Sequence, residues 1–541
     1  MNKITKMIVA LFALCIAVAL VACKKGSADR AGKTVTAATV SLTVEVFDRG
    51  TDGGKTSPRD NEWTRWIQEQ FLKDQGIALE FIPIPRWEET VAINNLMAAG
   101  TPPDICLTYT QELVAQYRDL GGLFDMGPYM DSSMLSDLKA FLGPDPALPG
   151  RDLIRRFEDP ETKAVYTIPA RRMNTANRNM FIRKDWLDKL GLPVPQTLEA
   201  FYEVLQAFKE NAPGGPGQPI IPFGMGNNLA YEVLPMGYAF IDPALNLKDR
   251  WVNLVVDRHF LLPGYKEGVR FMNRMYNDGL IDPNFVLIKS EEERWNPVRA
   301  GAVGAFASDW DKIYRENDHI FSDLQKNVPE AELIAFDPIT GPDGVTRKLK
   351  YDSAGVFIFI PKTAKNPEAA LRYINWLARY ENYHFLQIGR EGINHDLIEG
   401  VPKLKIAQGP WIQNSPQNID YTLTINGLDL GDPELTLRGL ARGYPWPPTM
   451  IEKAYSIAMT NAMSDPIIPV SLSAAGAYTQ TLIDKGNALL AQAITGKPAD
   501  FDRVWEAGIQ DWLDSGAQAI IDEREAKFPS SAVAPPVGLR P

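Results

Sequence analysis

The sequence predicts an α/β protein with doubly wound sheets, in which strands and helices alternate. Apolar and polar residues alternate at residues 40–46, the pattern of a strand with one buried face. This strand is followed by a helix, a strand, a helix and a strand, at residues 61–73, 77–84, 87–99 and directly after residue 105. Such an order is typical of a parallel sheet covered by helices. We therefore expect a ligand at the carboxyl ends of these strands.

The N-terminal segment has the layout of a signal peptide. Lys3 and Lys6 precede an apolar run at residues 7–22, which is shorter than the roughly 20 residues that a membrane span needs. The run ends in Leu-Val-Ala-Cys23, which resembles a bacterial lipobox and implies lipidation of the Cys23 thiol, although a cysteine can follow such a run by chance. We expect a signal peptide at residues 1–22, and a lipidated cysteine with a flexible tether at 23–39.

Charge and cysteine content narrow the possible partners. The formal net charge of −11 argues against nucleic acid or anionic lipid as a general partner. If Cys15 is removed with the signal peptide and Cys23 is acylated, only Cys106 remains, so no intramolecular disulfide can form. We expect the fold to be held by its apolar core, as a monomer.

The stretch at residues 166–198 combines several local signals. A short apolar strand at residues 179–182 is followed by a helical pattern at 184–190, which Gly191 ends. Thr197 is then placed to cap a new helix at 199–210. The run RKDWLDKLGLPVPQT resembles the crossover into the second lobe of family 1 extracellular solute-binding lipoproteins, the sugar and oligosaccharide type of ABC importers.

Other runs match the same family in order. They are GTPPDI at 100–105, GAVGAF at 301–306 followed by Trp310, PKTAKNPEAA at 361–370, and a closing segment at 494–512. The resemblance implies a two-lobed periplasmic-binding-protein fold with a hinge between the lobes. It divides the chain into a first lobe at 40–170, a second lobe at 171–335, a return to the first lobe at 336–400, C-terminal helices of the second lobe at 401–529 and a disordered tail at 530–541.

The family also implies a function without covalent chemistry. Such a protein captures an oligosaccharide in the cleft between its lobes, closes at the hinge and delivers the ligand to the membrane permease of an ABC importer. The Cys23 lipid would anchor it on the extracytoplasmic face of the cell membrane. Two alternatives remain open: a binding protein for peptides or another solute, and an extracellular glycan-active enzyme.

Motifs for catalysis or metal binding are not found in the sequence. The four histidines have no HExxH or HxH spacing, and the chain has no CxxC, no Walker loop and no G-x-S-x-G elbow. Carboxylate pairs such as Glu88 and Glu89 are typical of a solvated face in so acidic a chain. Many family members carry an aspartate-rich calcium loop after the long helix of the second lobe, but residues 211–219 contain no carboxylate. We therefore expect no cofactor and no metal.

A sugar site needs flat aromatic faces and side chains that hydrogen-bond to hydroxyls. The family places such groups on loops that face the cleft, and the matching positions here are Asp48 and Arg49 after the first strand, Tyr109 after the third, Arg171 and Arg172 at the first crossing, Asp309 and Trp310 after the glycine-rich strand, and Tyr444 and Trp446 before a late helix at 449–461.

Each of these residues has a structural alternative. Asp48 and Arg49 could pair with one another, and Arg171 and Arg172 could form salt bridges between lobes or be merely exposed. If the two arginines face the cleft, a uronate-containing oligomer is favoured, because arginine binds carboxylates with two hydrogen bonds. Trp310, Trp411 and Trp446 lie beside loops, so stacking on a ligand and packing in the core are equally expected of them. The tryptophans at helical spacing are expected in the core: Trp63, Trp66, Trp186, Trp376, Trp505 and Trp512.

Overall fold

The computed structural model describes residues 40–146, 150–159, 161–214, 219–226, 228–242, 244–337, 343–405 and 409–529. The predicted signal peptide, Cys23 with its tether, the C-terminal tail and part of the loop at 211–219 lie outside these residues. Two large groups of buried apolar side chains define a first lobe and a second lobe. Within the described ranges, no helix combines the length and hydrophobicity needed to cross a membrane.

The first lobe is built on a mixed sheet. Strands β1 (Val40–Asp48) and β2 (Ile77–Pro85) pair in parallel, and a bridge between Val44 and Ile105 leads to β3. β3 (Cys106–Thr108) pairs antiparallel with β10 (Ala354–Phe359), and β10 pairs antiparallel with β4 (Ile168–Arg172). β13 (Ile425–Asn426) then lies parallel to β4 at the edge of the sheet. The predicted alternation of strands and helices over residues 40–108 is confirmed.

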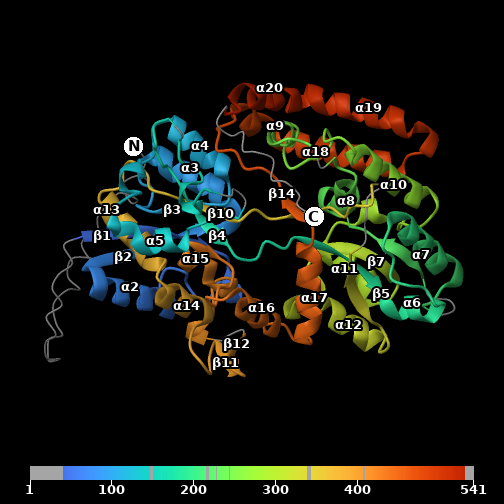
Figure 1. Cartoon of the computed structure of the whole chain (residues 1–541), viewed down its shortest axis with the longest axis horizontal. Helices are drawn as coiled ribbons and strands as arrows, with labels where there is room; N and C mark the ends of the chain where they lie inside the picture. Colours follow the sequence, from blue (N-terminus) through green and yellow to red (C-terminus); the bar gives the residue numbers. More distant parts are fainter. Residues whose placement is uncertain are drawn as a thin grey trace, which may run out of the picture. The chain divides into compact units, whose positions relative to one another are not determined.

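Helices surround this sheet (Figure 1). They are α2 (Glu62–Gln75), α3 (Glu89–Ala99), α4 (Gln111–Asp119), α5 (Ser136–Phe141), α13 (Pro367–Leu377), α14 (Tyr380–Ile388) and α15 (Ile419–Thr422), and a small hairpin of β11 (His395–Ile398) and β12 (Val401–Leu404) follows α14. Asn61 starts α2, because its side chain accepts hydrogen bonds from the backbone N–H groups of Trp63 and Thr64. Trp63 and Trp376 are fully buried in the core, as predicted from their helical spacing.

The second lobe is built on a four-stranded sheet in the order β6 (Ile221–Gly224), β7 (Val303–Asp309), β5 (Arg178–Arg183) and β8 (Leu333–Phe336). β6 and β7 are parallel, whereas β5 runs antiparallel to both of its neighbours. Its helices are α6 (Lys184–Leu190), α7 (Leu198–Asn211), α8 (Leu229–Ala239), α9 (Leu247–Val252), α10 (Tyr265–Asn277), α11 (Glu291–Arg299), α12 (Ile320–Asn327), α17 (Pro448–Met459), α18 (Ser473–Thr495), α19 (Phe501–Trp512) and α20 (Gln518–Lys527).

The start of the second lobe follows the predicted order of β5, α6 and α7. Gly191 ends α6 with a left-handed backbone (φ 65°), and Thr197 Oγ1 accepts a hydrogen bond from the Ala200 N–H at 3.1 Å. Further along, α18 and α19 run side by side (Figure 1), and Trp505 and Trp512 of α19 pack their rings against Phe260. These tryptophans are core residues, as predicted.

Three segments link the lobes: residues 173–177, 351–353 and 427–447, the last including α16 (Pro433–Arg442). The return to the first lobe therefore comes later than residue 336, where we expected it to begin. The reason is that β9 (Lys348–Lys350) still belongs to the second lobe, where it pairs with β14 (Ala462–Ser464) and contacts β5.

Part of the segment that we expected in the second lobe after residue 400 belongs to the first. Trp411, Tyr421 and Leu423 lie in the first core, and β13 pairs with β4. Trp411 meets the Trp63 ring edge-to-face at 5.0 Å between centroids. Trp411 and Tyr421 lie in helical stretches of only three and four residues, which are too short to show a periodic pattern that would have indicated their partners.

Candidate functional site

A central hollow of about 290 Å³ is lined by residues of both lobes and of the linking segments at 173–177 and 351–353. It is lined by Tyr109, Arg172, Asn174, Ala176, Asn177, Asp309, Trp310, Asp311, Arg315, Tyr351 and Asn426. Its lining combines aromatic rings, amides and charged groups from segments that are far apart in the sequence. A second hollow, between β5, α8 and β9, has a volume of only about 30 Å³, so of these two hollows the central one is large enough to admit a sugar ring.

Tyr109, on the first-lobe side, is held from several directions. Its ring stacks on Phe47 with 5.9 Å between centroids, and the Arg86 guanidinium lies 4.1 Å from its centroid. Glu89 accepts the backbone N–H of Tyr109 at 2.9 Å and also pairs with Arg86 at 2.9 Å. The ring is therefore positioned by the protein itself.

Arg172 ends β4 and also lines the hollow. Its guanidinium lies 4.6 Å from the centroid of Tyr351 and passes close to Gly355, where an added Cβ would be only 3.1 Å from Nη2. Burial lowers the pKa of Arg172, and its Nε is buried without a hydrogen-bond partner among the described residues. Asp352 is close in sequence to Tyr351, but both of its oxygens accept from Arg156 at 2.7 Å.

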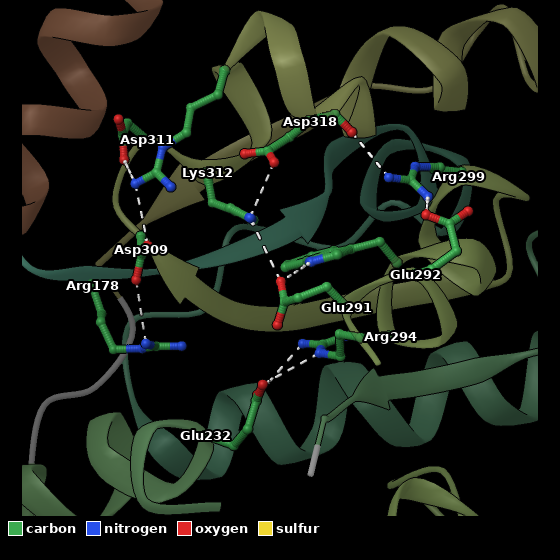
Figure 2. Close-up of polar contacts among 12 residues, drawn as sticks. Arg178, Glu232, Glu291, Glu292, Arg294, Arg299, Asp309, Asp311, Lys312 and Asp318 are labelled. Atoms are coloured by element: carbon green, nitrogen blue, oxygen red, sulfur yellow. Dashed lines mark hydrogen bonds and ion pairs between the residues drawn. The ribbon is translucent and has the colours of Figure 1, made fainter. Parts of the chain in front are cut away.

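On the second-lobe side of the hollow, basic and acidic side chains alternate in the order Arg178, Asp309, Arg315 and Asp311. Asp309 accepts from Arg178 at 3.4 Å and from Arg315 at 3.2 Å, and Arg315 also contacts Asp311 at 2.6 Å. Figure 2 shows the row from Arg178 through Asp309 to Asp311, beside the ion pairs of α11. Burial lowers the pKa of Arg315, but Asp311 and Asp309 outweigh that effect, so its pKa is raised.

Trp310 follows this row and is only 3% exposed. Its ring meets those of Tyr455 and Tyr444 edge-to-face, with centroid distances of 5.3 and 6.1 Å. The Tyr444 hydroxyl donates to Asp311 at 2.7 Å. Tyr444 therefore supports the residues of the hollow but does not line it.

Four other predicted site residues do not line the hollow. Arg49 nevertheless interacts with the side chain of Tyr109, which does line it. Arg49 pairs with Asp420 and Asp48 accepts the Gly50 N–H, so the alternative that these two pair with each other is wrong. Arg171, one residue before Arg172, donates to the carbonyls of residues 141, 143 and 144. Trp446 stacks on Phe321 with 4.4 Å between centroids.

The sequence interpretation missed several lining residues. Asn174 and Asn177 lie in a polar run at the first crossing, which was an available signal, but Tyr351, Arg315 and Asn426 carry no comparable signal. It also missed Trp87, which is 82% exposed although it is a large aromatic residue. Arg86 lies 5.0 Å from the Trp87 ring centroid as well as close to Tyr109, so an exposed aromatic surface adjoins the hollow.

No cluster of three or more His, Cys, Asp or Glu that could hold a metal ion occurs in the described part of the chain. Cys106 is a buried free thiol and does not line the hollow. The residues that do line it offer hydrogen bonding, charge and aromatic stacking.

A family model described as bacterial extracellular solute-binding protein matches residues 54–383. The chain belongs to this family. Lipoprotein LipO of Bacillus subtilis is 31% identical over 41% of the chain, which spans 45% of LipO. The polygalacturonan/rhamnogalacturonan-binding protein YtcQ of the same organism is 22% identical over 89% of the chain and 94% of its own length.

Solved structures of similar fold support the two-lobed architecture of this family member. An extracellular solute-binding protein from Bifidobacterium longum subsp. infantis superposes with a TM-score of 0.66, at 19% identity, over 90% of this chain and 97% of the other. At this identity the likeness establishes the fold.

Proposed function

We propose that this solute-binding protein captures an oligosaccharide in the central hollow and delivers it to the permease of an ABC importer. The observation that carries the proposal is the composition of the hollow. Tyr109 and the 41%-exposed Tyr351 supply aromatic surface beside the largely buried Trp310, and three asparagines supply amides that can both donate and accept, namely Asn174, Asn177 and Asn426. Sugar rings present C–H faces and hydroxyls, which these two kinds of group complement. The similarity to YtcQ, which is named as a polygalacturonan/rhamnogalacturonan-binding protein, agrees with the proposal.

The mechanism would be closure about the three linking segments. A ligand that touches Tyr109 in the first lobe and the partly exposed Asp309 and Arg315 in the second is held better when the lobes are close together. Ligand binding therefore shifts the protein toward the closed arrangement in proportion to its differential affinity. The importer would recognise that arrangement, and no bond of the ligand is broken.

We further propose that the protein acts as a monomer on the extracytoplasmic face of the membrane, held by a lipid on Cys23. The lipobox-like sequence and the likeness to LipO support this location. Labelling of the full chain with palmitate in a bacterial host tests it, since Cys23→Ala should abolish incorporation and Cys106→Ala should not.

Thermal unfolding with a panel of neutral oligosaccharides, uronate oligosaccharides and peptides tests the binding function. A ligand at about a hundred times its dissociation constant adds roughly 2.7 kcal/mol to stability, which raises the midpoint measurably. A rise with saccharides supports the proposal, and a rise with peptides alone contradicts it.

The glycan-active alternative is tested by incubating each saccharide with the protein and looking for shorter products. Asp309 and Asp311 line the hollow, but both are ion-paired with Arg315. We expect intact saccharide, whereas cleavage that Asp309→Asn abolishes would replace the binding function with an enzymatic one.

A further inference from the structure

The charges of the central hollow leave one cation without a partner. Two arginines line it, and Arg315 is paired with both Asp309 and Asp311. Arg172 forms no ion pair among the described residues, and its Nε has no hydrogen-bond partner there. Arginine stays charged at every physiological pH, so the hollow keeps a positive group that the protein does not neutralise.

The position of Arg172 is set by its neighbours. The Tyr351 ring lies beside the guanidinium, and Gly355 leaves room for it, because a Cβ at that position would stand only 3.1 Å from Nη2 and the guanidinium would have to shift. A guanidinium held in this way loses little freedom when it binds a ligand. A half-buried cation without a counter-charge is costly in the empty protein, and an anion of the ligand would remove that cost.

We propose that Arg172 binds a carboxylate of the ligand, so that the preferred oligosaccharide contains uronate residues; this inference rests on the proposed function. A carboxylate offers two oxygens to the guanidinium, which a hydroxyl does not. Asp309 and Asp311, on the second-lobe side of the same hollow, disfavour a group with two negative charges such as a phosphate. A singly charged carboxylate matches the single unpaired cation.

Isothermal titration of the full chain with trigalacturonate and with its methyl ester isolates this contact, because esterification removes the charge and keeps the ring. We expect the unmodified protein to bind the acid at least tenfold more tightly than the ester. Arg172→Gln should reduce this ratio to near one by weakening binding of the acid alone. Arg172→Lys, which keeps the charge without the fork, should give an intermediate ratio.

Arg171→Gln is the matched control, since it removes the same charge one residue away, where the side chain binds carbonyls of residues 141–144. It should retain the acid preference, and thermal unfolding of each variant checks that it is folded. If Arg172→Gln does not fold, Arg172→Lys still carries the test.

The possible failures are distinguishable. Equal affinity of the unmodified protein for acid and ester, or an acid preference that persists in the Arg172 variants, overturns the role of Arg172 and leaves saccharide binding intact. Binding of neither trigalacturonate, its ester nor any saccharide of the thermal panel overturns both this inference and the proposed function.

Discussion

Arg49 donates two hydrogen bonds to Asp420, which lies 371 positions further along the chain, at 2.8 and 2.9 Å. Asp420 is only 1% exposed and also accepts from Asn414. The pair ties the end of β1 to α15 within the first lobe. Arg49, a predicted ligand residue, therefore also holds the framework of the first lobe together.

Loss of this pair should destabilise the fold. Arg49→Ala leaves the Asp420 carboxylate buried without its cation, and we expect a decrease of about 3–5 kcal/mol in the free energy of unfolding, measured by urea denaturation. Arg65→Ala is the control, because Arg65 pairs with Asp60 at the surface and should cost less than about 1 kcal/mol. Equal losses in the two variants would contradict the framework role.

Trp446 should matter for stability and not for ligand affinity. Its ring stacks on Phe321 away from the lining of the hollow, so Trp446→Ala should lower the free energy of unfolding by about 0.5–3 kcal/mol. Titration of the same saccharide should give an unchanged Kd, whereas Tyr109→Ala should raise the Kd by about tenfold. A comparable rise in Kd for Trp446→Ala would return that residue to the binding site.

Trp87 should contact saccharides that are too long for the hollow. Its ring is exposed and follows the Tyr109 and Arg86 stack, so Trp87→Ala should leave stability within about 0.5 kcal/mol. The affinity for a hexasaccharide should fall roughly three- to tenfold, with a smaller change for a disaccharide. Leu120→Ala, at another exposed apolar position, should change neither affinity. A uniform loss for both saccharide lengths would argue against an outer contact.

Glu523 should make part of the stability depend on pH. Its carboxylate accepts from the backbone N–H groups of Ser473 and Ala474 at the start of α18 and from Lys527. Burial raises the pKa of Glu523, but these donors outweigh it and lower the pKa to about 2. A depressed pKa gives stability that is complete above the unfolded-state value near 4.5 and is lost as the pH falls toward 2.

Glu523→Gln should therefore be about 1 kcal/mol less stable than the unmodified protein at pH 7, with the difference shrinking below pH 4.5. Urea denaturation across this range measures it. Glu525→Gln on the same helix, whose surface pair with Lys248 is exposed, is the control. A difference that stays constant with pH would show that the carboxylate does not cap α18.

Local chemistry allowed the sequence to predict much of the backbone. The order of β5, α6 and α7 depended on Gly191 and Thr197, whose effects act within one helical turn. Burial of Trp63, Trp186 and Trp376 followed from helical spacing, since a ring on the apolar face of an amphipathic helix packs inward. These features need no knowledge of distant residues.

The members of the site required the tertiary structure. Arg171 and Arg172 are adjacent and chemically identical in the sequence, yet side chains alternate along a strand, so one binds carbonyls of the first lobe and the other lines the hollow. The ion pair of Arg49 with Asp420 could not be predicted, because its partner lies far along the chain.

The sequence by itself thus determined the family resemblance, the two-lobed α/β class and the local elements, because short-range spacing carries that information. Only the tertiary structure decided which charged groups are paired. Tyr351 of the second linking segment and Gly355 of β10 reach Arg172 after the chain has passed through the second lobe, and Asp420 reaches Arg49 from still later in the chain. Ion pairing depends on distances of a few ångströms between groups hundreds of residues apart, and folding alone brings them together.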